Sequence, residues 1–186
     1  MTIKHPFAKS KAKYLSGKFE YQYLLLGTFP SEKSRESGFF YGNPQNAFWK
    51  VLGEVFEENL SALNPAQKEK WLDGQGIALY DLIDEYEGES WYSNDGDLFL
   101  KGREHKYCRD FVTTFAQKFP QAKIGGTSRE VETKFRQQFC SVYPKETRKD
   151  EVLTKLEIFY LPSPSPLNTN IIGKERTRQW REFFDK

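Results

Sequence analysis

Short apolar runs alternate along the chain with segments of helical periodicity. Four runs bounded by glycine, proline or charge are typical of buried parallel strands: Tyr21–Gly27, Gly76–Ile83, Ala122–Gly125 and Leu156–Leu161. Apolar spacing between and after these runs predicts five helices: Asn46–Glu58, Pro65–Asp73, Tyr107–Phe119, Ser128–Phe139 and Lys174–Phe184. Strands that alternate with helices favour an α/β fold, in which a four-stranded parallel sheet carries helices on both faces.

Two polar segments interrupt this pattern. Asp84–Asp97 is acidic and contains a turn-like Asn-Asp-Gly, and Pro144–Lys155 is rich in charged residues. We expect both to be solvated loops, and for the second a position near phosphate groups is the alternative. The 186 residues contain neither an internal repeat nor a Pro/Ser-rich linker, so we expect residues 1–186 to form one domain.

Composition narrows the class of protein only slightly. Aromatic residues make up 16% of the chain, which is enough for a core and for flat surfaces on which nucleobases stack. A net charge of +2 permits nucleic-acid binding without indicating it. No apolar run has the length of a membrane span, and the first residues lack the apolar stretch of a signal peptide. We therefore expect a cytoplasmic protein without a membrane partner.

Two loops follow the carboxyl ends of predicted strands, where open α/β sheets bind their ligands. In Gly27–Ser31, Gly27 lets the backbone approach a ligand closely and Pro30 stiffens the turn. Leu161–Asn168 contains three alternating prolines, which forbid a helix and favour a rigid, extended loop. A rigid loop can press into a nucleic-acid duplex at low entropic cost. An ordinary connection from strand to helix is the alternative.

The residues around these loops resemble a known enzyme family. Leu-Leu-Leu-Gly-Thr-Phe-Pro-Ser at 24–31 and Gly-Phe-Phe-Tyr-Gly-Asn-Pro-Gln-Asn-Ala-Phe-Trp at 38–49 are similar to the first active-site motif of the uracil-DNA glycosylase superfamily. Leu161–Ser165 resembles its Pro/Ser-rich second motif. Leucine at the start of that motif, in place of histidine, is typical of the hypoxanthine-DNA glycosylase branch. The mismatch-specific uracil-DNA glycosylases are the next most similar group. The resemblance also includes His5-Pro6-Phe7 and Trp180.

This resemblance implies a monofunctional DNA glycosylase. Such an enzyme would remove deaminated bases, hypoxanthine first and uracil second, from double-stranded DNA and would leave an abasic site. The implied enzyme is a monomer associated with the nucleoid. The base pocket that the resemblance implies consists of Gly27, Thr28, Phe29, Tyr41 and Asn43, with Tyr41 stacked on the base. The implied DNA-binding residues are Pro162, Ser163, Pro164, Ser165 and Asn168.

The catalytic residue that the resemblance implies is Asn46, which would orient a water molecule. Many members of the superfamily carry an Asn or Asp two residues after the first-motif glycine, where this chain has Phe29. The hypoxanthine branch shares that loss. Asn46 also begins a predicted helix, so a role as N-cap is the alternative. Asp81, at the end of the second strand, is open to two interpretations, a role facing water or a loop anchor.

Two departures from the family's usual Gly-His-Pro-Gln-Asn-Arg-Phe-Trp leave room for other functions. Asn43 replaces the histidine and Ala47 replaces the arginine. Together with Phe29, these two departures indicate an alternative function, that of a catalytically silent, DNA-binding member of the superfamily. A flavodoxin-like protein for a small ligand is the third interpretation. Neither a phosphate-binding loop nor a dinucleotide-binding glycine motif occurs, and the two histidines and two cysteines are too far apart for a zinc site, so we expect neither cofactor nor metal.

Overall fold

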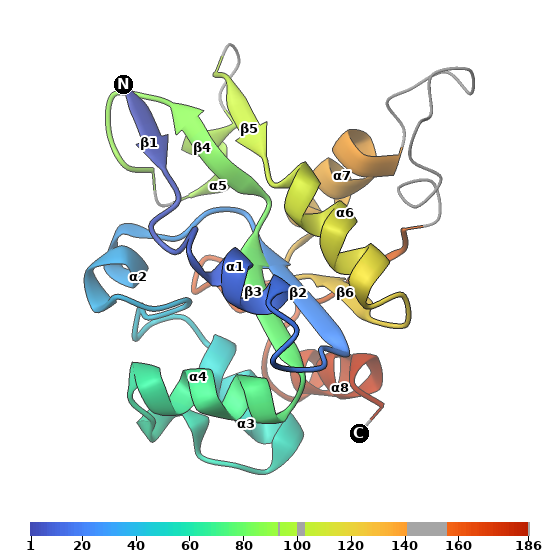
Figure 1. Cartoon of the computed structure of the whole chain (residues 1–186). Helices are drawn as coiled ribbons and strands as arrows, with labels where there is room; N and C mark the ends of the chain where they lie inside the picture. Colours follow the sequence, from blue (N-terminus) through green and yellow to red (C-terminus); the bar gives the residue numbers. More distant parts are fainter. Residues whose placement is uncertain (93, 100–102, 141–155, 186) are drawn as a thin grey trace.

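The predicted parallel sheet is present in the computed structural model of the chain, which describes residues 1–92, 94–99, 103–140 and 156–185. Its four strands are all parallel and follow the order β3-β2-β6-β7 (Figure 1). They are Tyr23–Gly27 (β2), Ile77–Asp81 (β3), Lys123–Gly126 (β6) and Ile158–Tyr160 (β7). Leu24, Leu25 and Leu26 of the central strand β2 have no exposed surface. Burial on both faces explains why this strand is a continuous apolar run.

The five predicted helices are present with shifted ends. They are Phe48–Phe56 (α3), Pro65–Gly74 (α4), Arg109–Lys118 (α6), Arg129–Phe135 (α7) and Gly173–Phe183 (α8). A π-helical turn at Arg136–Cys140 (η2) extends α7. Four short helical segments were not predicted: Ser10–Leu15 (α1), Glu32–Ser37 (α2), Asp95–Leu98 (α5) and the 3₁₀ turn Leu60–Ala62 (η1). Their shortness leaves too few apolar positions for a helical period to be recognised.

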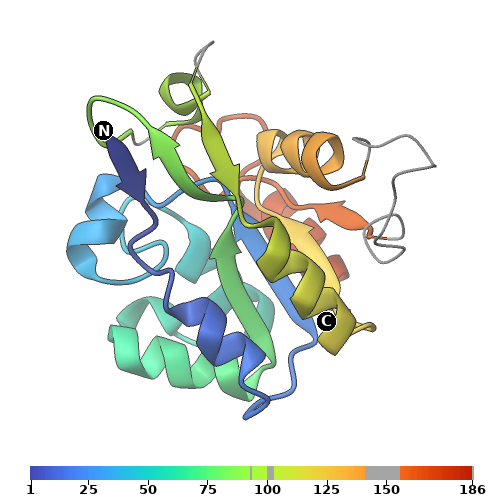
Figure 2. The same ribbon diagram turned by 45° about the horizontal axis from the view of Figure 1, so that its top comes forward.

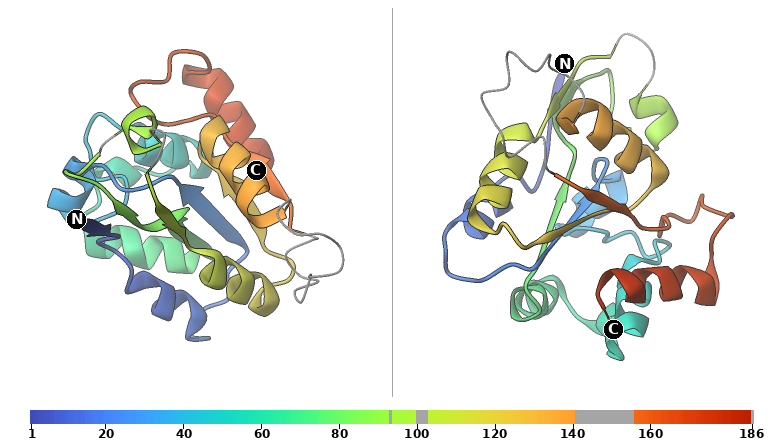
Figure 3. Two further views of the ribbon diagram at one scale, coloured as in Figure 1. Left: turned by 90° about the horizontal axis from the view of Figure 1, so that it is seen from above. Right: turned by 90° about the vertical axis from the view of Figure 1, so that its right-hand side faces the viewer.

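Helices cover both faces of the parallel sheet, as predicted. Helices α1 and α6 pack together on one face, and α3 and α8 pack together on the other (Figure 3). Between α3 and α8, Phe48 meets the edge of Trp180 at a ring-centroid distance of 5.6 Å. Both side chains are fully buried. This contact fixes the position of the chain immediately before α3, which carries Asn46.

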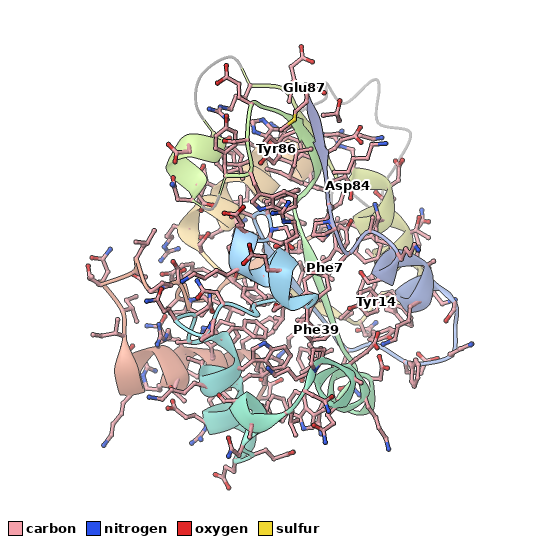
Figure 4. The ribbon with its side chains drawn as sticks, turned by 90° about the vertical axis from the view of Figure 1, so that its left-hand side faces the viewer. Phe7, Tyr14, Phe39, Asp84, Tyr86 and Glu87 are labelled. Atoms are coloured by element: carbon pink, nitrogen blue, oxygen red, sulfur yellow. The ribbon has the colours of Figure 1, made fainter. Side chains whose placement is uncertain are left out.

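A second, antiparallel sheet was missed by the sequence analysis. Its strands are Thr2–Lys4 (β1), Ile83–Glu87 (β4) and His105–Tyr107 (β5), in the order β1-β4-β5. β4 begins two residues after β3 ends, and it joins β1 and β5 beyond the end of the parallel sheet (Figure 2). Figure 4 shows Tyr86 of β4 above Phe7, which follows β1.

The prediction that Asp84–Asp97 is a solvated loop is therefore wrong. The segment begins inside β4, where Tyr86 is 1% exposed, and it ends in α5. Between them, the Trp91 indole N–H donates to the Pro30 carbonyl over 2.8 Å, which ties the segment to the loop after β2. Pro144–Lys155 lies outside the described residues. Within the described part of the chain, no helix has both the length and the apolar character needed to cross a membrane.

Candidate active site

A cavity of about 470 Å³ lies at the carboxyl ends of three parallel strands. Its floor contains the last residues of β2 and β3, Gly27 and Asp81, and the first residue after β6, Thr127. Its walls come from the loop after β2, from the chain before α3, from the start of α5 and from the proline-rich loop after β7. This is the position at which open α/β sheets bind ligands, so we take the cavity as the candidate site.

The floor is built around Asp81. Its Oδ2 lies 2.9 Å from Nε2 of His5, and both side chains are buried. Since Nδ1 of His5 accepts a hydrogen bond from the Phe7 N–H, the proton of the neutral ring is on Nε2 and is donated to the carboxylate. A Cβ at position 27 would overlap Oδ1 of Asp81, so only glycine leaves room for this carboxylate.

Tyr41 forms one side of the cavity. Its ring stacks on Phe48 at a centroid distance of 3.8 Å, and its hydroxyl lies 3.1 Å from Oγ1 of Thr127. Because the Thr127 hydroxyl donates to the Leu26 carbonyl, the Tyr41 hydroxyl donates to Thr127. Burial raises the pKa of Tyr41, so the phenol stays protonated. The backbone of Tyr41 has φ of +53°, a strained value for a side chain of this size.

Phe29 forms a second aromatic wall. Its ring is edge-on to Tyr86 at 5.1 Å and lies 5.2 Å from Trp91. The Arg35 guanidinium covers Trp91 at 4.5 Å from the ring centroid. The segment that was expected to be solvated therefore supports the wall of the cavity from behind.

Asn46 lines the cavity and also bonds to the start of a helix. Its Oδ1 accepts a hydrogen bond of 2.9 Å from the backbone N–H of Phe48, the first residue of α3. The N-cap of α3 is Ala47, so the expectation that Asn46 is the N-cap is wrong, although its side chain still satisfies a free N–H of the first turn. An amide oxygen has a second lone pair for another donor. The next residue, Ala47, donates its backbone N–H to the Pro164 carbonyl over 2.8 Å. That bond joins the Asn46 loop directly to the proline-rich loop.

The proline-rich loop is held at three consecutive carbonyl groups. The carbonyl of Pro162 accepts from the Trp180 indole and that of Pro164 from Ala47. The Ser163 carbonyl accepts from Nδ2 of Asn168 at 2.9 Å and from Arg176 at 3.2 Å. These bonds fix the loop in one shape, which agrees with the stiffness predicted from its prolines.

Most of the predicted site residues meet at this cavity. Those that line it are Gly27, Thr28, Phe29, Tyr41, Asn46, Ser163, Pro164, Ser165 and Asn168. Asn43 and Pro162 do not line it. The Asn43 side chain accepts the N–H of Gln45 in a local turn, and Pro162 is buried beside Trp180.

Several lining residues were not named as site residues from the sequence, and two of them bear on function. Leu167 is 75% exposed at the proline-rich loop, and Asp95 enters from α5. Burial raises the pKa of the Asp95 carboxyl above its ordinary value. The alternating prolines predict a rigid loop but do not mark Leu167 within it. The acidic composition around Asp95 indicated a solvated loop. Among the described residues, no group of three or more His, Cys, Asp and Glu side chains is placed to hold a metal ion.

Comparisons with known proteins support one family. No protein-family model matches the chain. Over 60 residues, 32% of this chain, it is 38% identical to the hypoxanthine DNA glycosylase of Methanosarcina acetivorans and 33% identical to that of Methanosarcina barkeri. The match spans 38% of the length of each of these relatives.

The fold has a solved counterpart. The solution NMR structure of a proposed uracil DNA glycosylase from Methanosarcina acetivorans matches 89% of this chain and 89% of its own, with a TM-score of 0.61 and 25% sequence identity. The α/β architecture is therefore a uracil-DNA glycosylase-like fold. The chain resembles the uracil-DNA glycosylase superfamily and, within it, the hypoxanthine-DNA glycosylase branch.

Proposed function

We propose that this protein is a monofunctional DNA glycosylase that removes deaminated bases, hypoxanthine first and uracil second, from double-stranded DNA. The observation that carries the proposal is that a single cavity brings together both motif loops and Asn46, with aromatic walls on two sides. The sequence similarity to enzymes described as hypoxanthine DNA glycosylases supports the same conclusion. A cytoplasmic monomer acting at the nucleoid is part of this proposal.

Entry of a base into the cavity requires that its nucleotide rotate out of the duplex. One face of Tyr41 is covered by Phe48, and its cavity side is the surface on which we place the extruded base. Exposed Leu167, on a loop fixed by its carbonyl bonds, is positioned to enter the gap that the base leaves. Apolar side chains that enter a base step stabilise an unstacked duplex. Deaminated bases pair poorly, so their extrusion costs less, and selectivity begins at this step.

Cleavage of the N-glycosidic bond leaves positive charge on the sugar and negative charge on the departing base. Asn46 is too weak a base to deprotonate water, but its amide can orient a water for attack on the cation-like sugar. Polar groups preorganised at the floor of the cavity stabilise the charge that develops. None of the described residues that line the cavity is a lysine. Without an amine to form a covalent adduct with the sugar, the reaction ends at an abasic site, which is why we propose a monofunctional enzyme.

A nicking assay tests this function. The protein is incubated with labelled duplexes that carry one deoxyinosine or one deoxyuridine, and half of each sample is then treated with alkali. We expect nicks at deoxyinosine that appear only after alkali, because alkali breaks the chain at an abasic site. Nicks without alkali would contradict the monofunctional assignment. Cleavage only at deoxyuridine would move the substrate to the uracil branches, and binding without any cleavage would favour the silent DNA-binding protein.

A further inference from the structure

Asp95 is a carboxylate inside the cavity that the proposed mechanism does not use. It is the first residue of α5, it is partly buried, and it lines the cavity between its exposed neighbours Asn94 and Gly96. The short helix does not need this carboxylate, since its N-cap is Asn94, whose side chain accepts the N–H of Asp97. Within the described residues, Asp95 forms no salt bridge.

The Asp95 carboxyl group interacts electrostatically with residues at and near the floor. Burial raises the pKa of Asp95, a hydrogen bond from the Thr28 side chain lowers it, and the negative charges of Glu130 and Asp81 raise it further. Asp95 also raises the pKa of Tyr41 by its charge. The carboxyl group thus lies within electrostatic reach of the strand-end residues and of the stacking wall. Keeping an unpaired carboxylate there costs stability, which is common where a group serves function.

Deamination changes one feature of a base in a way that a carboxylate can detect. The ring nitrogen on the pairing edge is N1 in adenine and N3 in cytosine, and in both bases it is a hydrogen-bond acceptor. In hypoxanthine and uracil, the same nitrogen carries a hydrogen and is a donor. A carboxylate only accepts, and it has about four lone-pair sites. It attracts the ring N–H of the deaminated base and repels the ring lone pair of the adenine or cytosine from which that base arose.

We propose that Asp95 determines specificity by accepting the ring N–H that deamination creates, N1–H of hypoxanthine or N3–H of uracil. This inference rests on the proposed function. The base is the leading part of an extruded nucleotide and passes the wall that contains Asp95 and Thr28, while the sugar and phosphates stay near Leu167 at the mouth. Thr28 then acts as a positioning residue that orients the carboxylate.

The test compares two bases that differ at this nitrogen. Duplexes carry either deoxyinosine or deoxynebularine, whose purine ring has an acceptor at N1. Single-turnover excision rates are measured for the wild-type protein, for Asp95→Asn and for the control Asp97→Asn. Asp97 is exposed, lies on the same short helix and does not line the cavity. The amide of Asp95→Asn has nearly the shape of the carboxylate and can donate to N1, so we expect the preference for deoxyinosine to fall by about tenfold to a hundredfold.

Binding supplies a second readout that does not depend on the chemical step. The same two bases are placed on 2′-fluoroarabino sugars, which resist cleavage because fluorine disfavours a cation-like sugar. We expect the affinity ratio for the two duplexes to fall in Asp95→Asn and to stay unchanged in Asp97→Asn. Melting temperatures confirm that each variant is folded.

Three outcomes would overturn the inference. A preference for deoxyinosine that is unchanged in Asp95→Asn refutes it directly. An equal loss on both bases would mean that Asp95 acts on the sugar or on water and does not read the base. If the wild-type protein excises no base from any duplex, the proposed function itself fails and this inference fails with it.

Discussion

Replacing Asn46 by alanine separates its structural role from its catalytic role, because the expected loss of stability is small and the expected loss of excision rate is large. The substitution removes the 2.9 Å bond from the Phe48 N–H to Oδ1, and a single hydrogen bond typically contributes about 1 kcal/mol to stability. A domain of this kind has a stability of roughly 5–15 kcal/mol, so at least about 3 kcal/mol remains and more than about 99% of the molecules stay folded. Unfolding therefore reduces the excision rate by about 1% or less.

Loss of a water-orienting amide has a far larger effect. Misplacement of a reacting group by about 1 Å typically costs about a hundredfold in rate. We therefore expect Asn46→Ala to lower the single-turnover excision of hypoxanthine by about a hundredfold or more, with a melting temperature only slightly reduced. Excess enzyme and quenched time points measure the chemical step without interference from product release.

Two further variants distinguish catalysis from the bond that Asn46 makes to the start of α3. Asn46→Ser keeps an oxygen that can accept the Phe48 N–H, but its side chain is shorter, so it should restore the melting temperature and leave excision low. Asn59→Ala makes the same change at an exposed asparagine that does not line the cavity and should excise hypoxanthine like the wild type. Recovery of activity in Asn46→Ser, or a loss of less than about threefold in Asn46→Ala, would refute the reasoning, since the effect would then be no larger than that of one lost hydrogen bond.

Three other predictions follow from the floor and the mouth of the cavity. In Gly27→Ala the new Cβ overlaps Asp81 and lies 2.8 Å from the Tyr41 hydroxyl, so urea unfolding should show a loss of about 1–3 kcal/mol together with loss of excision; a variant as stable and active as the wild type would contradict this. Leu167→Ala should leave the melting temperature unchanged, since the side chain is 75% exposed, and should lower excision from duplex DNA by about tenfold while sparing single strands. Equal effects on both substrates would rule out a role in the duplex. Because the pKa of Asp95 is raised in the folded protein, the protonated form is favoured by folding, and its contribution to stability is lost as pH rises through that pKa. Asp95→Asn should therefore melt higher than the wild type at neutral pH, with a difference that shrinks in acid, and a lower melting temperature at neutral pH would show that the carboxylate supports the fold.

The parallel sheet could be predicted because its signal is local. Leu24, Leu25 and Leu26 form an apolar run that only a strand buried on both faces explains, and glycine marks its end. The small sheet gave no comparable signal. β1 and β5 have three residues each. β1 pairs with β4, which lies about eighty residues further along the chain, and Ile3 stands opposite Tyr86. Pairing across such a separation is a tertiary property that periodicity does not contain.

The cavity residues divide in the same way, into those with a local sequence signal and those that depend on tertiary contacts. Gly27 and the proline-rich loop were found because strand ends and prolines have a fixed meaning in an α/β sheet. Asp95 was missed because an acidic turn is usually solvated, and its contact with Thr28 exists only after Trp91 ties the segment to the Pro30 carbonyl. The resemblance selected Asn46, whereas the residues alone indicated a helix cap with equal justification.

The two carboxylates of the cavity have different physical consequences. Asp81 is held by the His5 N–H in a buried pair, and its Oδ1 leaves no room for a Cβ at position 27. Asp95 lies in the wall of the cavity, where burial raises the pKa of its carboxyl group and hydrogen bonding from the Thr28 side chain lowers it. A negative charge near a departing anionic base opposes catalysis, and on our proposal the opposition is small because N1 of a purine lies on the far side of the ring system from the glycosidic N9. The same charge acts at full strength on adenine, whose N1 lone pair would meet the carboxylate directly. The gain from rejecting adenine and cytosine exceeds the loss in rate, since these bases must not be excised. Guanine and thymine carry a ring N–H of their own, so other contacts must reject them.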